Sequence, residues 1–151
     1  MIEIFTDGAA QGNPGPGGYG AILRYGKHEK ELSGGYRLTT NNRMELLAVI
    51  VALESIKKNG LPIKIVTDSQ YVANAISKGW LWNWEKKNFK DKANQDLWRR
   101  YIPLHKKFNP KLIWVKGHAG HAENERCDQL AVAAATGGQL LRDEGYEAIQ
   151  D

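Results

Sequence analysis

The chain has 151 residues, of which 25% are charged and 42% hydrophobic, a composition that excludes a disordered or collagen-like chain. A chain of this length buries about 68–70% of its unfolded surface on folding, which is enough for the core of an enzyme. We therefore expect residues 1–151 to form a single catalytic domain. One cysteine excludes an intramolecular disulfide, and no stretch approaches the roughly 20 apolar residues of a membrane span, so we expect a cytoplasmic protein.

The net charge of +4 is unevenly distributed along the chain. Residues 78–107 hold nine basic and three acidic side chains and are therefore net +6, which leaves −2 for the rest. The same segment contains four of the five tryptophans. A basic segment on a mildly acidic body predicts a polyanionic partner. The competing interpretation is a solvated helix face, which is common for runs of lysine.

The hydrophobic pattern changes period several times along the chain. It predicts strands at residues 2–7, 19–25 and 30–38, with a glycine- and proline-rich loop over residues 8–18. A largely apolar helix follows over residues 42–58, closed by Gly60 and Pro62, and then a strand at residues 63–68 and a short helix at residues 70–78.

The second half of the chain is predicted to be mostly helical. Helical pieces over residues 80–107, broken around Asn88 and Pro103, precede a strand at residues 111–116 and a last helix over about residues 122–135, while residues 137–151 give no clear signal. Three consecutive strands indicate an antiparallel meander, and a strand reached through a long helix indicates a parallel neighbour. We therefore expect an α/β fold with a mixed five-stranded sheet, three antiparallel strands followed by two parallel ones, flanked by helices.

Two of the predicted strands end in the same way. Residues 2–8 and residues 63–69 share the pattern Ile-x-Ile-apolar-Thr-Asp-small, which ends in Asp7 and Asp68. If the strands are parallel, both carboxylates lie at the sheet edge where open α/β sheets place ligands. The alternative is that each aspartate caps a turn or the following helix.

Two further carboxylates stand on predicted helices. Glu45 is the only acid in the first two turns of an apolar helix, where burial of an unpaired charge would be costly, although Asn42-x-x-Glu45 also has capping-box spacing. Asp128 lies in the last helix, where an early acid is also favoured by the helix dipole. Neither residue taken alone indicates a site.

Together, Asp7, Glu45, Asp68 and Asp128 would place four negative charges in one crevice, where they repel unless cations neutralise them. Two divalent ions would match that charge. All-oxygen carboxylate ligation favours Mg²⁺ or Mn²⁺ over Zn²⁺, and paired ions suit in-line attack on a phosphodiester.

A glycine-containing loop at residues 116–121 carries two histidines between the last predicted strand and the last helix. An imidazole there, His118 in particular, could move protons near neutral pH. A zinc site from His118, His121 and Cys127 is disfavoured, because there is one cysteine and no second Cys/His pair. Surface histidines in a polar loop are the remaining alternative, especially for His121.

The chain resembles the bacterial type 1 ribonucleases H in five sequence blocks that follow that family's order. The blocks are IFTDG at residues 4–8, GNPGPGGY at 12–19, TNNRME at 40–45, TDSQYV at 67–72, and WVKGHAGH at 114–121 continued by NERCD at 124–128. Five blocks in order are far more specific than any one of them.

The resemblance implies a metal-dependent endonuclease that hydrolyses the RNA strand of RNA–DNA hybrids and leaves 5′-phosphate and 3′-hydroxyl ends. It assigns metal binding and catalysis to Asp7, Glu45, Asp68 and Asp128, with Mg²⁺, two ions, as the cofactor and Mn²⁺ as a substitute. It assigns proton transfer or product release to His118. It implies a monomer with no obligate protein partner.

The resemblance also implies two sets of nucleic-acid contacts. Asn13, Asn41, Asn42 and Gln70 would contact the hybrid on its minor-groove side, where the 2′-hydroxyl distinguishes RNA from DNA. Residues 80–92 resemble the family's basic protrusion, with contacts expected from Trp80, Lys86, Lys87 and Lys90. The chain begins at its first strand, so we expect no separate hybrid-binding module.

Two other functions fit parts of the pattern. A relative acting on DNA, such as an integrase, transposase or resolvase, would use similar carboxylates, but the basic protrusion and the histidine loop favour the hybrid nuclease. A non-catalytic nucleic-acid-binding module would use the basic insert and would not depend on the carboxylates.

Overall fold

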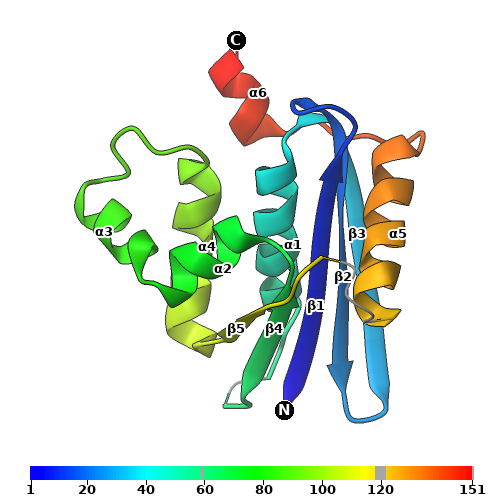
Figure 1. The fold of residues 1–151 in the computed structure, drawn as a ribbon, viewed down its shortest axis with the longest axis vertical. Coiled ribbons are helices and arrows are strands. Elements are labelled where there is room, and N and C mark those ends of the chain that lie inside the picture. Colours follow the sequence, from blue (N-terminus) through cyan, green and yellow to red (C-terminus); the bar gives the residue numbers. More distant parts are fainter. Residues whose placement is uncertain (59, 118–121, 151) are drawn as a thin grey trace.

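The computed structural model describes residues 1–58, 60–117 and 122–150, and a mixed five-stranded sheet is its centre (Figure 1). The strands are β1 (Ile2–Ala10), β2 (Gly15–Tyr25), β3 (His28–Thr39), β4 (Ile63–Thr67) and β5 (Lys111–Trp114). They lie in the order β3-β2-β1-β4-β5; β1–β2 and β2–β3 are antiparallel, whereas β1–β4 and β4–β5 are parallel. The predicted α/β fold and strand directions are confirmed.

Helices cover both faces of the sheet. The helices are α1 (Asn41–Glu54), α2 (Gln70–Ser77), α3 (Trp80–Lys86), α4 (Gln95–Phe108), α5 (Ala122–Thr136) and α6 (Glu144–Gln150). Alternate β1 side chains face opposite ways: Ile4 joins the large core formed with α1, α2 and α4, whereas Phe5 packs with Cys127 of α5. Figure 1 shows α5 on the far side of the sheet from α3 and α4, which belong to the helical insert over residues 80–108. None of the helices in the described ranges has the length and apolar character to cross a membrane.

The glycine-rich stretch is shorter as a loop than predicted. Strand β1 continues to Ala10 and β2 begins at Gly15, with Ala9 opposite Gly18 and Ala10 opposite Gly17. Backbone pairing overrides the low strand propensity of glycine, so the expected loop over residues 8–18 is wrong at both ends.

The start of α1 also differs from the prediction. Thr40 is the N-cap, and its side chain accepts a hydrogen bond from the backbone N–H of Arg43 at 3.2 Å. The helix therefore begins at Asn41, so the proposed capping box from Asn42 to Glu45 is wrong. It ends at Glu54 rather than residue 58, where the Ser55 hydroxyl donates to the carbonyl of Ala52 at 2.7 Å.

The helical insert breaks at only one of the two predicted places. Asn88 and Phe89 have positive φ values of 54° and 58° between α3 and α4, which confirms the first break. Pro103, in contrast, lies inside α4. Its missing N–H would have bonded to the carbonyl of Arg99, and both residues are exposed, so water can replace that hydrogen bond.

Candidate active site

Asp7 and Asp68 lie side by side in register on neighbouring parallel strands. Thr6 of β1 is opposite Thr67 of β4, so the aspartate that follows each threonine projects from the same edge of the sheet. Neither aspartate caps a helix, since Asp7 is inside β1 and Ser69, not Asp68, caps α2. The repeated sequence pattern therefore reflects a real structural repeat.

Glu45 reaches the same place from α1. The helix crosses β1 at Gly8, where an added Cβ atom would collide with the backbone nitrogen of Glu45 and with Met44. Only a glycine allows the helix to come this close to the strand. The close approach brings the buried Glu45 side chain beside Asp7.

The three carboxylates form a compact cluster with the chemistry of a divalent cation site. One oxygen from each of Asp7, Glu45 and Asp68 lies within 4.8 Å of the other two. Glu45 Oε2 is buried and has no hydrogen-bond partner in the described part of the chain, which would be unfavourable unless another group binds it. An all-oxygen donor set with a buried, unsatisfied carboxylate oxygen fits a hard cation such as Mg²⁺.

The protonation of the cluster reflects its burial. Desolvation raises the pKa of Asp7 to about 7, with smaller contributions from the charges of Asp68 and Asp128. Desolvation also raises the pKa of Glu45 well above its usual range, followed by the charges of Asp7 and Asp68. The cluster on its own therefore retains protons at neutral pH, and a bound cation would displace them.

Asp128 stands at the margin of this cluster. It lies half-buried on α5 and is close enough to raise the pKa of Asp7, but it is not among the three residues whose oxygens lie within 4.8 Å. The neighbouring Cys127 is fully buried and donates its thiol to the carbonyl of Phe5 at 3.2 Å. Burial raises the pKa of Cys127 to about 12, which disfavours the thiolate that zinc would need.

The two predicted loop histidines, His118 and His121, lie outside the described residues. The described residues beside them include Trp114, which the sequence analysis did not select. Its indole Nε1 donates to the main-chain oxygen of Asp68 at 3.0 Å, and the N–H of Val115 donates to the carbonyl of Thr67 at 2.9 Å. The end of β5 thus holds the backbone that carries Asp68. In the sequence, Trp114 stood out only as the first residue of the fifth family-like block, inside the strand predicted at residues 111–116.

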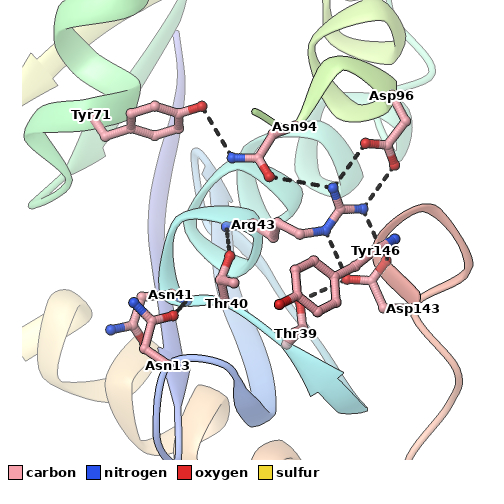
Figure 2. Close-up of polar contacts among 10 residues, drawn as sticks. All are labelled: Asn13, Thr39, Thr40, Asn41, Arg43, Tyr71, Asn94, Asp96, Asp143 and Tyr146. Atoms are coloured by element: carbon pink, nitrogen blue, oxygen red, sulfur yellow. Dashed lines mark hydrogen bonds and ion pairs between the residues drawn. The ribbon is translucent and has the colours of Figure 1, made fainter. Parts of the chain in front are cut away.

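Four predicted nucleic-acid contacts are exposed near the carboxylates. Asn13 Oδ1 accepts a hydrogen bond from the backbone N–H of Asn41 at 3.1 Å, so the loop after β1 is joined to the start of α1 (Figure 2). Asn42 is the next residue of that helix, and Gln70 begins α2 directly after Asp68 and Ser69. All four residues are exposed to solvent.

The insert combines exposed lysines with a partly exposed tryptophan. Trp82 and Trp84 pack against the main core, whereas Trp80 is 42% exposed and has Lys78 Nζ 5.5 Å from its ring centroid. Trp80, Asn83, Trp84, Lys87, Lys90 and Lys92 line a hollow of about 240 Å³. Lys86 is exposed but does not line it.

Comparison with known proteins places these features in a family. A sequence model described as RNase H matches residues 1–136. A protein named ribonuclease H from Pectobacterium carotovorum is 56% identical over 98% of this chain and 97% of its own length. Another from Syntrophus aciditrophicus is 53% identical over 97% of this chain and 87% of its own length.

Two solved structures share the architecture. LC9-RNase H1, described as a type 1 RNase H with the type 2 active-site motif, has 32% identity and a TM-score of 0.81, over 98% of this chain and 79% of that chain. LC11-RNase H1, solved in complex with an RNA/DNA hybrid, has 23% identity and a TM-score of 0.72, over 89% of this chain and 96% of that chain. The second likeness shows a shared fold.

Proposed function

The chain belongs to the ribonuclease H family, and from that premise we propose that it hydrolyses the RNA strand of RNA–DNA hybrids, giving 5′-phosphate and 3′-hydroxyl ends. The observation that carries the proposal is the cluster of the buried Asp7 and Glu45 with the half-buried Asp68, in which one oxygen of each carboxylate lies within 4.8 Å of the other two. Carboxylates this close together repel one another unless protons or cations neutralise them.

We propose that Asp7, Glu45, Asp68 and Asp128 hold divalent cations, with Mg²⁺ as the cofactor, two ions in the full site, and Mn²⁺ as a substitute. The chemistry that paired cations supply when bound is activation of a water molecule and stabilisation of the leaving oxygen. Asp7 and Glu45 must lose their protons before they can act as ligands, because burial raises the pKa of both carboxyls.

The proton-transfer role is assigned to His118 on the sequence pattern. An imidazole that titrates near neutral pH can give a proton to the leaving 3′-oxygen or assist departure of the product. In the sequence, His118 comes ten residues before Asp128, whose helix α5 begins at Ala122.

The exposed amides of Asn13, Asn41, Asn42 and Gln70 are proposed to bind the hybrid in its minor groove. Amide groups can both donate to and accept from a 2′-hydroxyl, which is the group that distinguishes RNA from DNA. The hydrogen bond from Asn41 to Asn13 supports this role, because it holds two of the four at a fixed spacing.

The insert is proposed to hold the phosphate backbone of the hybrid. The exposed Trp80 and the lysines Lys87 and Lys90 share one hollow, and Lys86 lies exposed on the same helix. Lysine provides charge for phosphate, and an exposed indole provides a face for sugar or base. We further propose that the protein is a single catalytic domain that acts as a cytoplasmic monomer without an obligate protein partner.

One comparison of substrates tests the function. The protein would be incubated with Mg²⁺ and with matched RNA–DNA hybrid, DNA duplex and RNA duplex. We expect cleavage of the RNA strand of the hybrid alone, and loss of turnover with retained hybrid binding in the Asp7→Asn variant. Cleavage of duplex DNA alone would instead support a DNA-processing relative, and full function of Asp7→Asn would support a non-catalytic binding module.

A further inference from the structure

Arg43 is an almost fully buried cation in the first turn of α1, with 2% of its side chain exposed. Its Nε and Nη2 donate to the two oxygens of Asp143 at 2.9 Å, and its Nη1 and Nη2 donate to those of Asp96 at 2.8 Å (Figure 2). Asp96 belongs to α4 and Asp143 to the C-terminal segment. One guanidinium therefore joins three parts of the chain that are distant in sequence.

Asp143 also caps the C-terminal helix α6. Its Oδ2 accepts from the hydroxyl of Thr39 at 2.7 Å, and its Oδ1 accepts from the backbone N–H of Tyr146 at 3.3 Å, which places Asp143 as the cap of α6. The Tyr146 ring centroid lies 5.9 Å from the Arg43 guanidinium. The same carboxylate thus starts α6, joins it to the end of β3 and holds Arg43.

The C-terminal segment has a second attachment that does not involve α1. Leu141 forms a parallel bridge with Tyr36 of the edge strand β3, and Glu147 is paired with Arg37 at 2.9 Å. These contacts hold the segment to the sheet. Asp143 connects the segment to the beginning of α1 through the ion pair with Arg43, and the Tyr146 ring lies against the same guanidinium.

The two residues directly before Arg43, Asn41 and Asn42, are among those proposed to meet the hybrid. Thr40 caps the backbone N–H of Arg43, and the adjacent Asn41 is bonded to Asn13. On its other side, Arg43 contacts the amide oxygen of Asn94 at 3.4 Å, while the amide nitrogen of Asn94 donates to the hydroxyl of Tyr71 at 3.1 Å. Arg43 therefore contacts the start of α1 and Asn94 directly, and it is linked to α2 through the bond from Asn94 to Tyr71.

We infer that Asp143, acting through Arg43, is a positioning residue for the substrate-binding edge. The inference rests on the proposed function. Asn41 and Asn42 are exposed in the first turn of α1, and the buried side chain nearest to them in sequence is Arg43. Glu45 is placed separately, by the close packing of its backbone on Gly8. Loosening Arg43 should therefore weaken hybrid binding and leave turnover at saturating substrate and Mg²⁺ nearly unchanged.

Two variants disturb Arg43 in different ways. Asp143→Asn removes the charge of one of the two carboxylates that pair with Arg43, but asparagine also caps helices well. Gly145→Ala removes no charge, yet the added Cβ atom would collide with the carboxylate of Asp96 and press on Arg43. The control is Glu147→Gln on the same helix. It removes the ion pair with Arg37 of β3, and Glu147 is not among the residues that bond to the Arg43 guanidinium in the described part of the chain.

Steady-state cleavage of the hybrid, well below the unfolding temperature of each variant, provides KM and kcat, and the Kd for hybrid without metal provides a second readout. We expect Asp143→Asn and Gly145→Ala to raise KM and Kd by about three- to tenfold with kcat within about twofold of wild type, and Glu147→Gln to leave all three unchanged.

Three results would overturn the inference: unchanged KM and Kd in a folded variant, a fall in kcat that matches the rise in KM, or an equal effect of Glu147→Gln. If Asp143→Asn does not fold, Gly145→Ala decides the question. A wild-type protein that binds the hybrid but does not cleave it would refute the proposed function, and the Kd values would still test Asp143.

Discussion

The indole N–H of Trp114 donates to the main-chain oxygen of Asp68 at 3.0 Å, although the Trp114 side chain is largely exposed. The bond fixes the peptide that follows β4, at the point where the chain leaves the sheet and Asp68 turns toward Asp7 and Glu45. The hydrogen bond thus helps to hold a candidate metal ligand in place.

The Trp114→Phe variant should therefore bind Mg²⁺ less tightly. A lost neutral hydrogen bond is worth about 1 kcal/mol, so we expect the Mg²⁺ concentration for half-maximal activity to rise about fivefold. Titration of activity with Mg²⁺ measures this. Trp80→Phe is the control, because it alters the insert and should leave the Mg²⁺ midpoint unchanged; equal midpoints for all three proteins would show that the indole bond does not position Asp68.

Stability without metal should depend on pH through Asp7. Its pKa rises from 3.8 in the unfolded chain to about 7 in the folded protein. Between these values the folded state binds more protons than the unfolded state, so stability decreases as pH rises from about 4 to about 7. Replacement of Asp7 by asparagine removes this loss.

The measurement is urea unfolding in EDTA at pH 5 and at pH 8. We expect Asp7→Asn to be more stable than wild type by roughly 2 kcal/mol at pH 8, with a smaller difference at pH 5, because the wild-type carboxyl is then protonated. Mg²⁺ should narrow the gap at pH 8 by stabilising the wild type alone. A gap that does not change with pH would mean that Asp7 titrates normally.

The sequence predicted best what the local pattern determines. Asp7 and Asp68 could be paired from sequence because two strands with the same pattern lie parallel and in register. Glu45 could be selected because an acid stood alone in an apolar helix, but its approach to Asp7 depends on the contact of α1 with Gly8, which no local pattern encodes.

The Arg43 network could not be predicted. Its partners lie 53 and 100 residues away in sequence, and the acidic segment that holds Asp143 showed no periodic hydrophobic pattern. Helix α6 is short and is held to the rest of the protein by contacts of Asp143 and Glu147. Such tertiary contacts, rather than a local sequence pattern, stabilise it. The indole bond of Trp114 is likewise a tertiary contact, formed by a side chain that looked like an ordinary strand residue.

Hybrid binding should depend less steeply on salt concentration when lysines that line the hollow of the insert are replaced by alanine. Each phosphate contact contributes about one unit to the slope of log K against log salt concentration, so Lys87→Ala together with Lys90→Ala should reduce the slope by about two. Lys57→Ala with Lys58→Ala is a matched control, since these lysines lie beyond the far end of α1. Lys86→Ala tests whether the exposed lysine outside the hollow also contacts phosphate, in which case the slope falls by about one more.

Arg43 and Arg100 provide a matched test of how burial changes the value of an ion pair. Arg100 is paired with Glu54, but both side chains are exposed, at 46% and 37%. Arg43 is 2% exposed between Asp96 and Asp143. Removal of a buried partner leaves uncompensated charge, whereas removal of an exposed one leaves a group that water solvates.

We therefore expect Arg43→Met to lower the free energy of unfolding by about 3–5 kcal/mol and Arg100→Met by less than about 1 kcal/mol, both measured by urea unfolding at pH 7. Adding Asp143→Asn to Arg43→Met should recover part of the lost free energy of unfolding, because it removes the charge of one of the two carboxylates that no longer pair with Arg43. If the double variant is less stable than Arg43→Met alone, the capping of α6 and the bond to Thr39, rather than the charge on Arg43, are the main contributions of Asp143.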